Sequence, residues 1–280
     1  MPLTDVPGKA RALYEARRTR QPIEPFTDAD PDLGMADGYA VQQQLTGMLL
    51  ADGDRIVGYK VGLTSKPMQQ MIGVDQPDYG PVLASTVYAD GDSVPLSSFI
   101  QPKIEAEIAF VLAEDLTGAM IGPAEVAAAT AYVVAALEIV DSRIAGWDIG
   151  IVDTVADNGS SGLFVLGDRR QGLGALDLAE CAMTLRRVAS GGDGGPDGAA
   201  WAGGEVVSTG TGASILGHPL AAVAWLAAAV RDHGSPLRAG EVVLSGSLGP
   251  MVSVAPGDAF LADISGVGQV SAIFAGGTSS

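Results

Sequence analysis

From Ile56 onward, the chain is divided into short apolar runs separated by glycine, proline and aspartate, and this division limits most strongly what it can fold into. Runs of strand length bounded by turn residues predict β-strands. The last part of the chain repeats the pattern, and four strands are predicted there. The runs concerned are RIVGYKVGLTS, SVPLSSFI and KIEAEIAFVLA, and then GEVVLSGS, MVSVAPGD, AFLADIS and GQVSAIF. No heptad repeat is visible, so a coiled coil is excluded.

Helices are predicted where apolar residues recur at helical spacing, over residues 8–18 and 35–50. Pro123 begins a short helix to Thr130, after which AYVVAALEIV changes to strand composition. Pro219 begins a longer helix that ends near Gly234. We therefore expect an α+β fold, in which residues 1–55 form a helical N-terminal part packed on the core and residues 56–280 form the main domain.

One segment is too rich in glycine to belong to either pattern. Residues Ser190 to Gly204 read SGGDGGPDGAAWAGG, with few apolar side chains. Such a composition predicts a loop, which we place between the two strands of a hairpin.

Charge and cysteine content exclude several classes of function. The chain has 16 Lys and Arg against 33 Asp and Glu, a net charge of −17, which repels nucleic acid and anionic membrane surfaces. No uninterrupted apolar run reaches membrane-spanning length, and the N-terminus has no signal-peptide pattern, so we expect a cytoplasmic protein. One cysteine and two histidines are too few for a zinc site of imidazole and thiolate. Any metal is expected to bind carboxylates.

The clearest candidate site is the stretch Ile104 to Val111. On a strand, side chains alternate, so Glu105 and Glu107 share one face of an otherwise apolar segment. Two buried carboxylates repel each other unless a cation compensates them, and Mg²⁺ or Mn²⁺ prefers oxygen ligands. Glu138, isolated in an apolar strand, is the best third ligand. The alternative is that the first two glutamates line a partly solvated strand face while Glu138 pairs with Arg143.

Two further charged residues are candidates. Lys60 lies in the apolar, glycine-flanked run VGYKVG, where it is either a functional lysine or a surface lysine with a buried stem. Asp78 lies in QPDYG, a turn sequence in which aspartate is common for structural reasons.

Several stretches of the chain together form a recognisable combination. They are GYKVGLTS (58–65), GVDQPDYG (73–80), QPKIEAEI (101–108), ALEIVDSR (136–143), VDTVADN (152–158), LGHPL (216–220) and GSLGPMV (246–252). In these stretches the chain resembles the 2-hydroxypenta-2,4-dienoate hydratases, also called 2-keto-4-pentenoate hydratases, of the fumarylacetoacetate hydrolase superfamily. The similarity covers nearly the whole chain and departs at the glycine-rich segment.

The resemblance implies a mixed β-roll, like the C-terminal domain of fumarylacetoacetate hydrolase, with flanking helices. It implies a divalent metal, Mg²⁺ or Mn²⁺, held by the same three glutamates that the strand pattern selects. It also places Lys60, Asp78 and Ser160 at the substrate, with Lys60 or Asp78 transferring protons.

The implied reaction adds water to 2-hydroxypenta-2,4-dienoate to give 4-hydroxy-2-oxopentanoate, in the meta-cleavage catabolism of aromatic compounds. The substrate is then a small anionic 2-oxo or 2-hydroxy acid. The family also implies a large homo-oligomer, a pentamer or decamer, associated with the aldolase that follows in the pathway. We further expect the N-terminal helices and the C-terminal strands to expose apolar faces that assembly covers.

Three alternatives remain open at this stage. A 4-oxalocrotonate decarboxylase or a 2-oxo-hept-4-ene-1,7-dioate hydratase would use the same chemistry on a dicarboxylate, with Lys103 or Arg143 binding the second acid group. A non-catalytic partner subunit is disfavoured because all the site residues are present. The monocarboxylate is favoured because an apolar far end, predicted from Leu63, Ile72, Val74 and Val82, would leave a second carboxylate unpaired.

Overall fold

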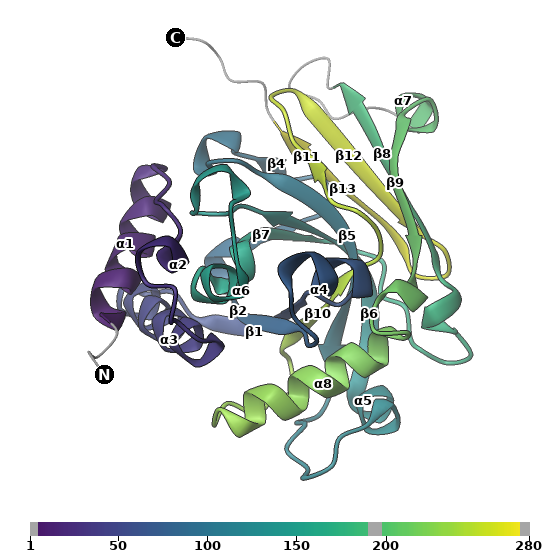
Figure 1. Ribbon diagram of the computed structural model, residues 1–280. Helices are drawn as coiled ribbons and strands as arrows, with labels where there is room; N and C mark the ends of the chain where they lie inside the picture. The colour runs from purple at the N-terminus through teal and green to yellow at the C-terminus, as the bar shows by residue number, and fades with distance from the viewer. Residues whose placement is uncertain (1–4, 190–197, 275–280) are drawn as a thin grey trace.

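Two mixed β-sheets and the helices around them make up the protein, as shown by a computed structural model that describes residues 5–189 and 198–274 (Figure 1). The larger sheet has the spatial order β2 (Asp78–Leu83), β1 (Ile56–Gly62), β10 (Val242–Ser247), β5 (Lys103–Leu112), β6 (Thr130–Val140), β7 (Ser161–Leu166) and β3 (Val87–Ala89), with β11 (Val252–Ser253) also pairing with β5. The smaller sheet has the order β4 (Ser93–Val94), β13 (Gly268–Phe274), β12 (Asp258–Ile264), β8 (Ala182–Ala189) and β9 (Glu205–Thr211). The predicted α+β class is confirmed.

The two sheets and helix α8 (Pro219–Asp232) enclose the main hydrophobic core. Alternation along β5 places Ile104, Ala106, Ile108 and Phe110 in this core and leaves the glutamates on the opposite face. Full burial of a side chain as large as Phe110 contributes about 1.5–3 kcal/mol. The strand pattern thus anchors β5 and at the same time fixes which way its glutamates point.

Helix α8 begins as the sequence predicts, with proline in its first turn. His218 caps it, its Nδ1 accepting a hydrogen bond from the backbone N–H of Leu220 at 3.0 Å. The stretch Gly212–Asp232 is long and apolar enough for a candidate membrane span, with a mean hydropathy of 1.7. Within it, however, the regular helix has 14 residues and buries one face in the core. We read it as a core helix.

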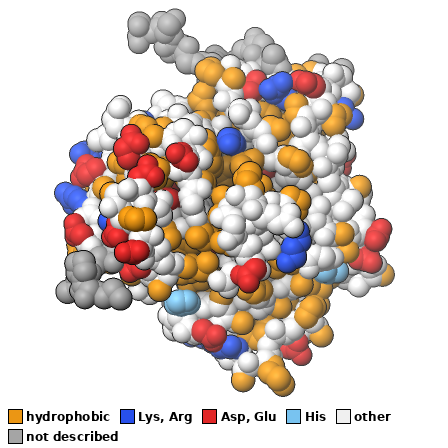
Figure 2. All heavy atoms as spheres, viewed as in Figure 1, with side chains coloured by type: hydrophobic (Ala, Val, Ile, Leu, Met, Phe, Trp, Pro, Cys, Tyr) orange, Lys and Arg blue, Asp and Glu red, His pale blue; other side chains and the backbone are white. Residues whose placement is uncertain are grey.

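The N-terminal helices pack on the side of the larger sheet (Figure 1). They are α1 (Val6–Thr19), α2 (Phe26–Ala29) and α3 (Met35–Ala51), and α2 lies between the two helices that the sequence predicts. Leu13 of α1 and Leu45 of α3 form a second cluster with Ile144 and Ala156, which belong to the rest of the chain. Acidic side chains gather on this side in Figure 2. Exposed acidic residues in and next to these helices are Glu24, Asp28, Asp32 and Asp52.

The remaining short elements connect these layers, and several of them position the site. They are α4 (Lys66–Ile72), η1 (Ala84–Thr86), η2 (Leu96–Ser98), α5 (Pro123–Ala129), η3 (Ala145–Trp147), α6 (Ile151–Ala156), η4 (Asn158–Ser160), η5 (Leu178–Glu180), α7 (Gly198–Ala202) and η6 (Gly212–Ser214).

The prediction that residues 190–204 form a loop is wrong for part of this glycine-rich segment. It connects β8 and β9, which pair as the predicted hairpin. Residues 198–202 of this segment form α7, a correction that the composition Gly-Ala-Ala-Trp-Ala explains, because alanine favours helix. Residues 190–197 lie outside the described part of the chain.

Candidate active site

Pairing of β5 with β6 brings the three predicted glutamates together. Glu105 lies directly opposite Glu138 in the antiparallel ladder, and Glu107 follows two residues along the same face of β5. One carboxylate oxygen from each residue can be chosen so that all three lie within 4.8 Å of one another. The cluster is therefore a product of strand register.

The surroundings of these carboxylates fit a cation. Glu107 is fully buried, and its Oε1 accepts no hydrogen bond in the described structure, whereas its Oε2 accepts one from Gly246 N at 2.8 Å. Burial, followed by repulsion from Glu138 and Glu105, raises the pKa of Glu107 well above its ordinary value. Burial also raises the pKa of Glu105 to about 7. An oxygen-only set with an unpartnered carboxylate oxygen can hold a hard divalent metal.

Lys60 of β1 is buried against this cluster and is not a surface lysine. Its Nζ lies 3.0 Å from Glu138 Oε1 and also donates to the carbonyl oxygen of Gly159. Burial opposes the charged form of the amine, but Glu138, Asp78 and Glu105 outweigh it, so the pKa of Lys60 is raised. The alternative pairing of Glu138 with Arg143 is wrong, because Arg143 Nε bonds Asp157 at 2.5 Å instead.

Asp78 begins β2 and is paired with Gly62 of β1. A Cβ on Gly62 would lie 2.0 Å from Asp78 Oδ1, so only glycine admits the carboxylate here. Asp78 is buried, and its Oδ1 has no hydrogen-bond partner in the described chain. Burial raises the pKa of Asp78, although Lys60 opposes the shift.

A strained turn carries the last predicted residue, Ser160. Asn158, Gly159 and Ser160 have φ values of 57°, 62° and 53°, a region that non-glycine residues avoid. A Cβ on Gly159 would lie 2.6 Å from Lys60 Cε, so this position too requires glycine. The Asn158 amide holds the turn by donating to Pro81 O at 3.1 Å. Strain at such a place is characteristic of functional sites.

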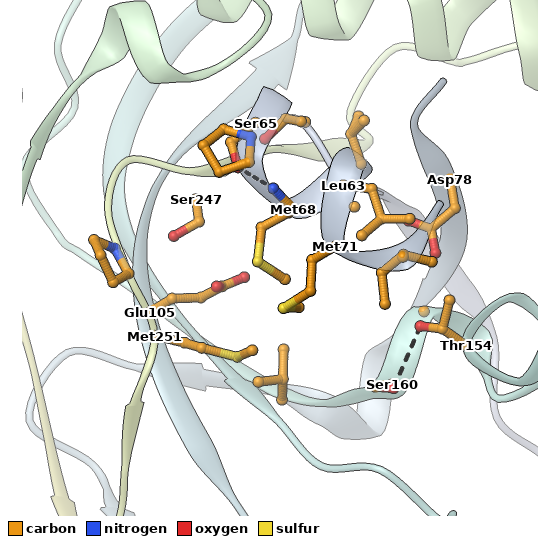
Figure 3. A pocket seen from close by; sticks show the side chains of 18 of the residues that line it. Leu63, Ser65, Met68, Met71, Asp78, Glu105, Thr154, Ser160, Ser247 and Met251 are labelled. Atoms are coloured by element: carbon orange, nitrogen blue, oxygen red, sulfur yellow. Dashed lines mark hydrogen bonds between the residues drawn. The ribbon is translucent and has the colours of Figure 1, made fainter. Parts of the chain in front are cut away.

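These groups open into a cavity of about 1090 Å³ (Figure 3). Glu105 and Ser247 project from one side, while Asp78, Thr154 and Ser160 project from the opposite side. Methionines occupy the space between, Met68 and Met71 from α4 and Met251 from the segment before β11. Glu107 and Glu138 lie beneath this surface, because both are buried.

Two of the predicted apolar pocket residues are elsewhere. Leu63 and Ile72 line the cavity, but Val74 and Val82 do not. Val82 packs with Ala109 and Leu244 in a separate cluster of the sheet. Val82 lies on the same face of β2 as Asp78, but four residues further along the strand, so it packs beyond the cavity. Val74 precedes β2 and is not part of the strand.

Sequence reasoning missed several groups that line the cavity. Thr154, on α6, has its hydroxyl 3.5 Å from that of Ser160. The carbonyl of Gly159 is a partner for Lys60 that no side-chain pattern reveals. For the methionines that line the cavity, one signal was available: Met68 and Met71 are three residues apart on α4, and positions i and i+3 of a helix share a face.

Cations make the cavity a favourable place for an anion in a protein of net charge −17. Lys60, Lys66 and Lys103 all line it. Lys103 Nζ lies 4.2 Å from the centroid of the Trp147 ring, and burial lowers its pKa. Lys103 and Arg143 were the two candidates for binding a second acid group. Lys103 lines the cavity, and Arg143 does not.

Comparison with known proteins is consistent with this geometry. Residues 59–274 match the model of the fumarylacetoacetate (FAA) hydrolase C-terminal family. The chain is 48% identical over 269 residues to a 2-keto-4-pentenoate hydratase of Burkholderia vietnamiensis (strain G4 / LMG 22486), covering 96% of this chain and 97% of the relative. It is 42% identical to a 2-hydroxyhexa-2,4-dienoate hydratase of Comamonas testosteroni, with 95% and 96% covered.

A solved structure extends the comparison to three dimensions. The 4-oxalocrotonate decarboxylase from Pseudomonas putida G7, complexed with magnesium and adipate, matches with a TM-score of 0.88. It is 34% identical, and the match covers 98% of each chain.

Proposed function

Because this chain belongs to the fumarylacetoacetate hydrolase family and is closely related to the 2-keto-4-pentenoate hydratases, we propose that it is a metal-dependent hydro-lyase. It adds water to 2-hydroxypenta-2,4-dienoate and forms 4-hydroxy-2-oxopentanoate, a step in the cytoplasmic catabolism of aromatic compounds by meta-cleavage. The observation that carries the proposal is the cluster of three carboxylates beside Lys60 under the cavity.

Glu105, Glu107 and Glu138 are the proposed metal ligands, and Mg²⁺ or Mn²⁺ is the proposed ion. The oxygen-only donor set and the unpartnered Glu107 Oε1 support this choice. A bound divalent cation supplies Lewis-acid polarisation of the substrate's carboxylate and adjacent 2-oxygen.

Lys60 and Asp78 are the proposed proton-transfer pair. Both side chains lie close to Gly159: a Cβ placed on this glycine would be 3.0 Å from Lys60 Nζ and 3.8 Å from Asp78 Oδ2. The reaction requires one proton to reach C5 as the 2-hydroxyl proton leaves, a hydroxyl from water to bond to C4, and one proton to reach C3. The pair can hold these protons next to the reacting carbons.

Ser160 and Thr154 are the proposed orienting residues. Their hydroxyls lie 3.5 Å apart on the wall that carries Asp78 (Figure 3). Between this wall and Glu105, Met68 and Met251 present thioether side chains, which shield the hydrocarbon part of a substrate from bulk water.

The deciding experiment compares two substrates by product mass. The purified protein is given 2-hydroxypenta-2,4-dienoate or 2-oxo-3-hexenedioate, with Mg²⁺ or Mn²⁺ present. Hydration adds the mass of one water, and decarboxylation removes that of one carbon dioxide. We expect hydration of the monocarboxylate with the higher kcat/KM. Preferential decarboxylation of the dicarboxylate would replace the proposed activity while leaving the metal site in place.

That second activity, of the 4-oxalocrotonate decarboxylase type, is favoured by one specific observation. Lys103 is a cation on the cavity wall, able to bind a second carboxylate. Lys103→Met distinguishes the hydratase from the decarboxylase. In a hydratase, the change should scarcely affect hydration of the monocarboxylate. In an enzyme for a dicarboxylate, it should lower activity by raising KM.

A large homo-oligomer, a pentamer or decamer associated with the following aldolase, is our proposal for the assembly. The apolar faces that we expected the N-terminal helices and C-terminal strands to expose do not support this proposal. The large hydrophobic side chains exposed in the described structure are Leu50, Met71, Met120 and Val206, of which none lies in β10–β13. The family resemblance supports the proposal, as does the frequency of symmetric assembly among enzymes. A light-scattering mass near 28.4 kDa would contradict it.

Residues 1–55 and 56–280 are proposed to form a single structural unit. The cluster shared by Leu13, Leu45 and Ile144 supports this view, because the N-terminal helices bury their apolar faces on the rest of the chain.

A further inference from the structure

A second cavity, of about 220 Å³, shares no lining residue with the first. Arg17 and Arg20, at the end of α1, line it together with Asp141 and Arg143, which follow β6. Tyr88 of β3 and Ser98 of η2 add hydroxyl groups. Three of the 16 cationic side chains of this acidic protein therefore meet at one small cavity.

Arg17 has no fixed partner there. Its guanidinium makes no hydrogen bond or salt bridge to the residues that the structure describes, although it is partly buried. Burial and the neighbouring Arg143 lower the pKa of Arg17 to about 10. A guanidinium that is desolvated next to another cation, without a counter-ion, is unfavourable on its own.

The acids near Arg17 are already engaged by other donors. Asp141 accepts the backbone N–H groups of Ile100 and Gln101, the latter at 2.7 Å. Asp157 accepts from Arg143 at 2.5 Å, and Asp54 accepts from Ser85 at 2.5 Å. The donors of Arg17 thus remain available to a ligand. The hydroxyls of Tyr88 and Ser98 also make no hydrogen bond within the described chain.

We propose that this cavity binds a small oxyanion, a phosphate or a carboxylate, with Arg17 as its principal ligand. The planar fork of an arginine matches two oxygens of such an anion. The hydroxyls of Tyr88 and Ser98 can donate to its remaining oxygens. The exposed Ser98 and Arg20 leave the cavity open to solvent, so the anion can enter.

The anion would bind against residues that hold the catalytic turn. Arg143 donates to Asp157 O at 2.8 Å and to Ser161 O at 2.9 Å, on either side of the turn that carries Ser160. The backbone N–H of Asp141 also donates to Ser160 O at 2.8 Å. Neutralising Arg17 next to this network stabilises the folded chain, so binding is expected to raise the melting temperature.

The test compares Arg17→Gln with Arg18→Gln. Arg18 is the matched control because it is on the same helix, exposed and paired with Glu15 at 2.8 Å. Phosphate, sulfate and acetate are titrated into metal-free protein at constant ionic strength, and binding is followed by calorimetry and melting temperature. Wild type and Arg18→Gln should bind one of these anions saturably. Arg17→Gln should bind it at least tenfold more weakly while melting as a folded protein in chloride.

Three outcomes would overturn the proposal, whereas the order of affinities among the anions identifies the class of ligand. Equal anion binding by Arg17→Gln and wild type would exclude Arg17 as the ligand. A rise in the melting temperature of the wild type no larger than that in chloride would show that no specific site exists. Tighter binding of acetate than of phosphate would identify carboxylates as the natural class, and the reverse order would identify phosphates. If Arg17→Gln binds no anion but lowers the light-scattering mass, while Arg18→Gln does not, a carboxylate of a second copy occupies the cavity instead.

Discussion

Lys60 Nζ lies 3.0 Å from Glu138 Oε1, so the proposed metal site and the proposed proton-transfer pair meet in a single buried ion pair. The two residues come from β1 and β6, which are separated in the larger sheet by β10 and β5. Side chains on one face of the sheet therefore reach across two intervening strands. The same lysine compensates part of the negative charge of the cluster and borders the cavity.

Metal removal should abolish hydration. Chelated, dialysed protein is expected to be inactive, and Mg²⁺ or Mn²⁺ should restore activity, with Zn²⁺ less effective because the cluster offers only oxygen ligands. The measurement is the initial rate after addition of each ion to protein shown to be metal-free. Full activity of that metal-free protein would contradict the metal hypothesis.

Glu107→Gln should weaken metal binding without unfolding the protein. The amide keeps the shape of the side chain, and it removes a buried charge that Glu138 and Glu105 repel. Metal affinity is expected to fall by at least the roughly 10–100-fold typical of changes outside the ligand set. Glu114→Gln, an exposed change just beyond β5, is the control, and isothermal titration with Mn²⁺ is the measurement. A variant that fails to fold would instead favour a purely structural role for Glu107.

Asp78→Asn should lower kcat while leaving metal affinity nearly unchanged. Loss of a group that transfers protons typically costs about 10²–10⁴-fold in rate. Asp75→Asn, in the same turn but exposed, should be nearly as active as the wild type. Steady-state kinetics and Mn²⁺ titration of both variants provide the comparison. Wild-type kcat in Asp78→Asn would exclude this residue from proton transfer.

Arg143→Gln should destabilise the fold. Its guanidinium is buried and bonds Asp157, so the change leaves a buried carboxylate uncompensated, at a cost of about 3–5 kcal/mol. Arg187→Gln breaks an exposed pair with Glu205 and should cost only about 0–1 kcal/mol. Urea unfolding of the two variants measures the difference. Similar losses in both would show that the buried pair contributes little.

Much of the fold follows from local sequence patterns. Glu105 and Glu107 share a face because strand side chains alternate, and Pro123 and Pro219 begin helices because the first turn needs no proline N–H. The change from helix to strand at Thr130 follows from the β-branched residues after it.

The sequence alone could not predict contacts between residues that are far apart in the chain. The pairing of Lys60 with Glu138 depends on the order of strands, and the pairing of Arg143 with Asp157 depends on how α6 packs. Val82 was misplaced because strand alternation gives its face, which Asp78 shares, but does not show where along the sheet the cavity ends. The helix α7 was missed because glycine dominates the average composition of its surroundings.

Because Glu105 pairs directly with Glu138, metal binding reports whether β5 and β6 are paired in the correct register. A slip of one residue between β5 and β6 would turn the side chains of the displaced strand to the opposite face. Molecules with such a slip would lack the complete ligand set, even if their secondary structure content were normal. The number of tight Mn²⁺ sites per chain would then count the correctly paired fraction of a preparation, a quantity that circular dichroism does not report.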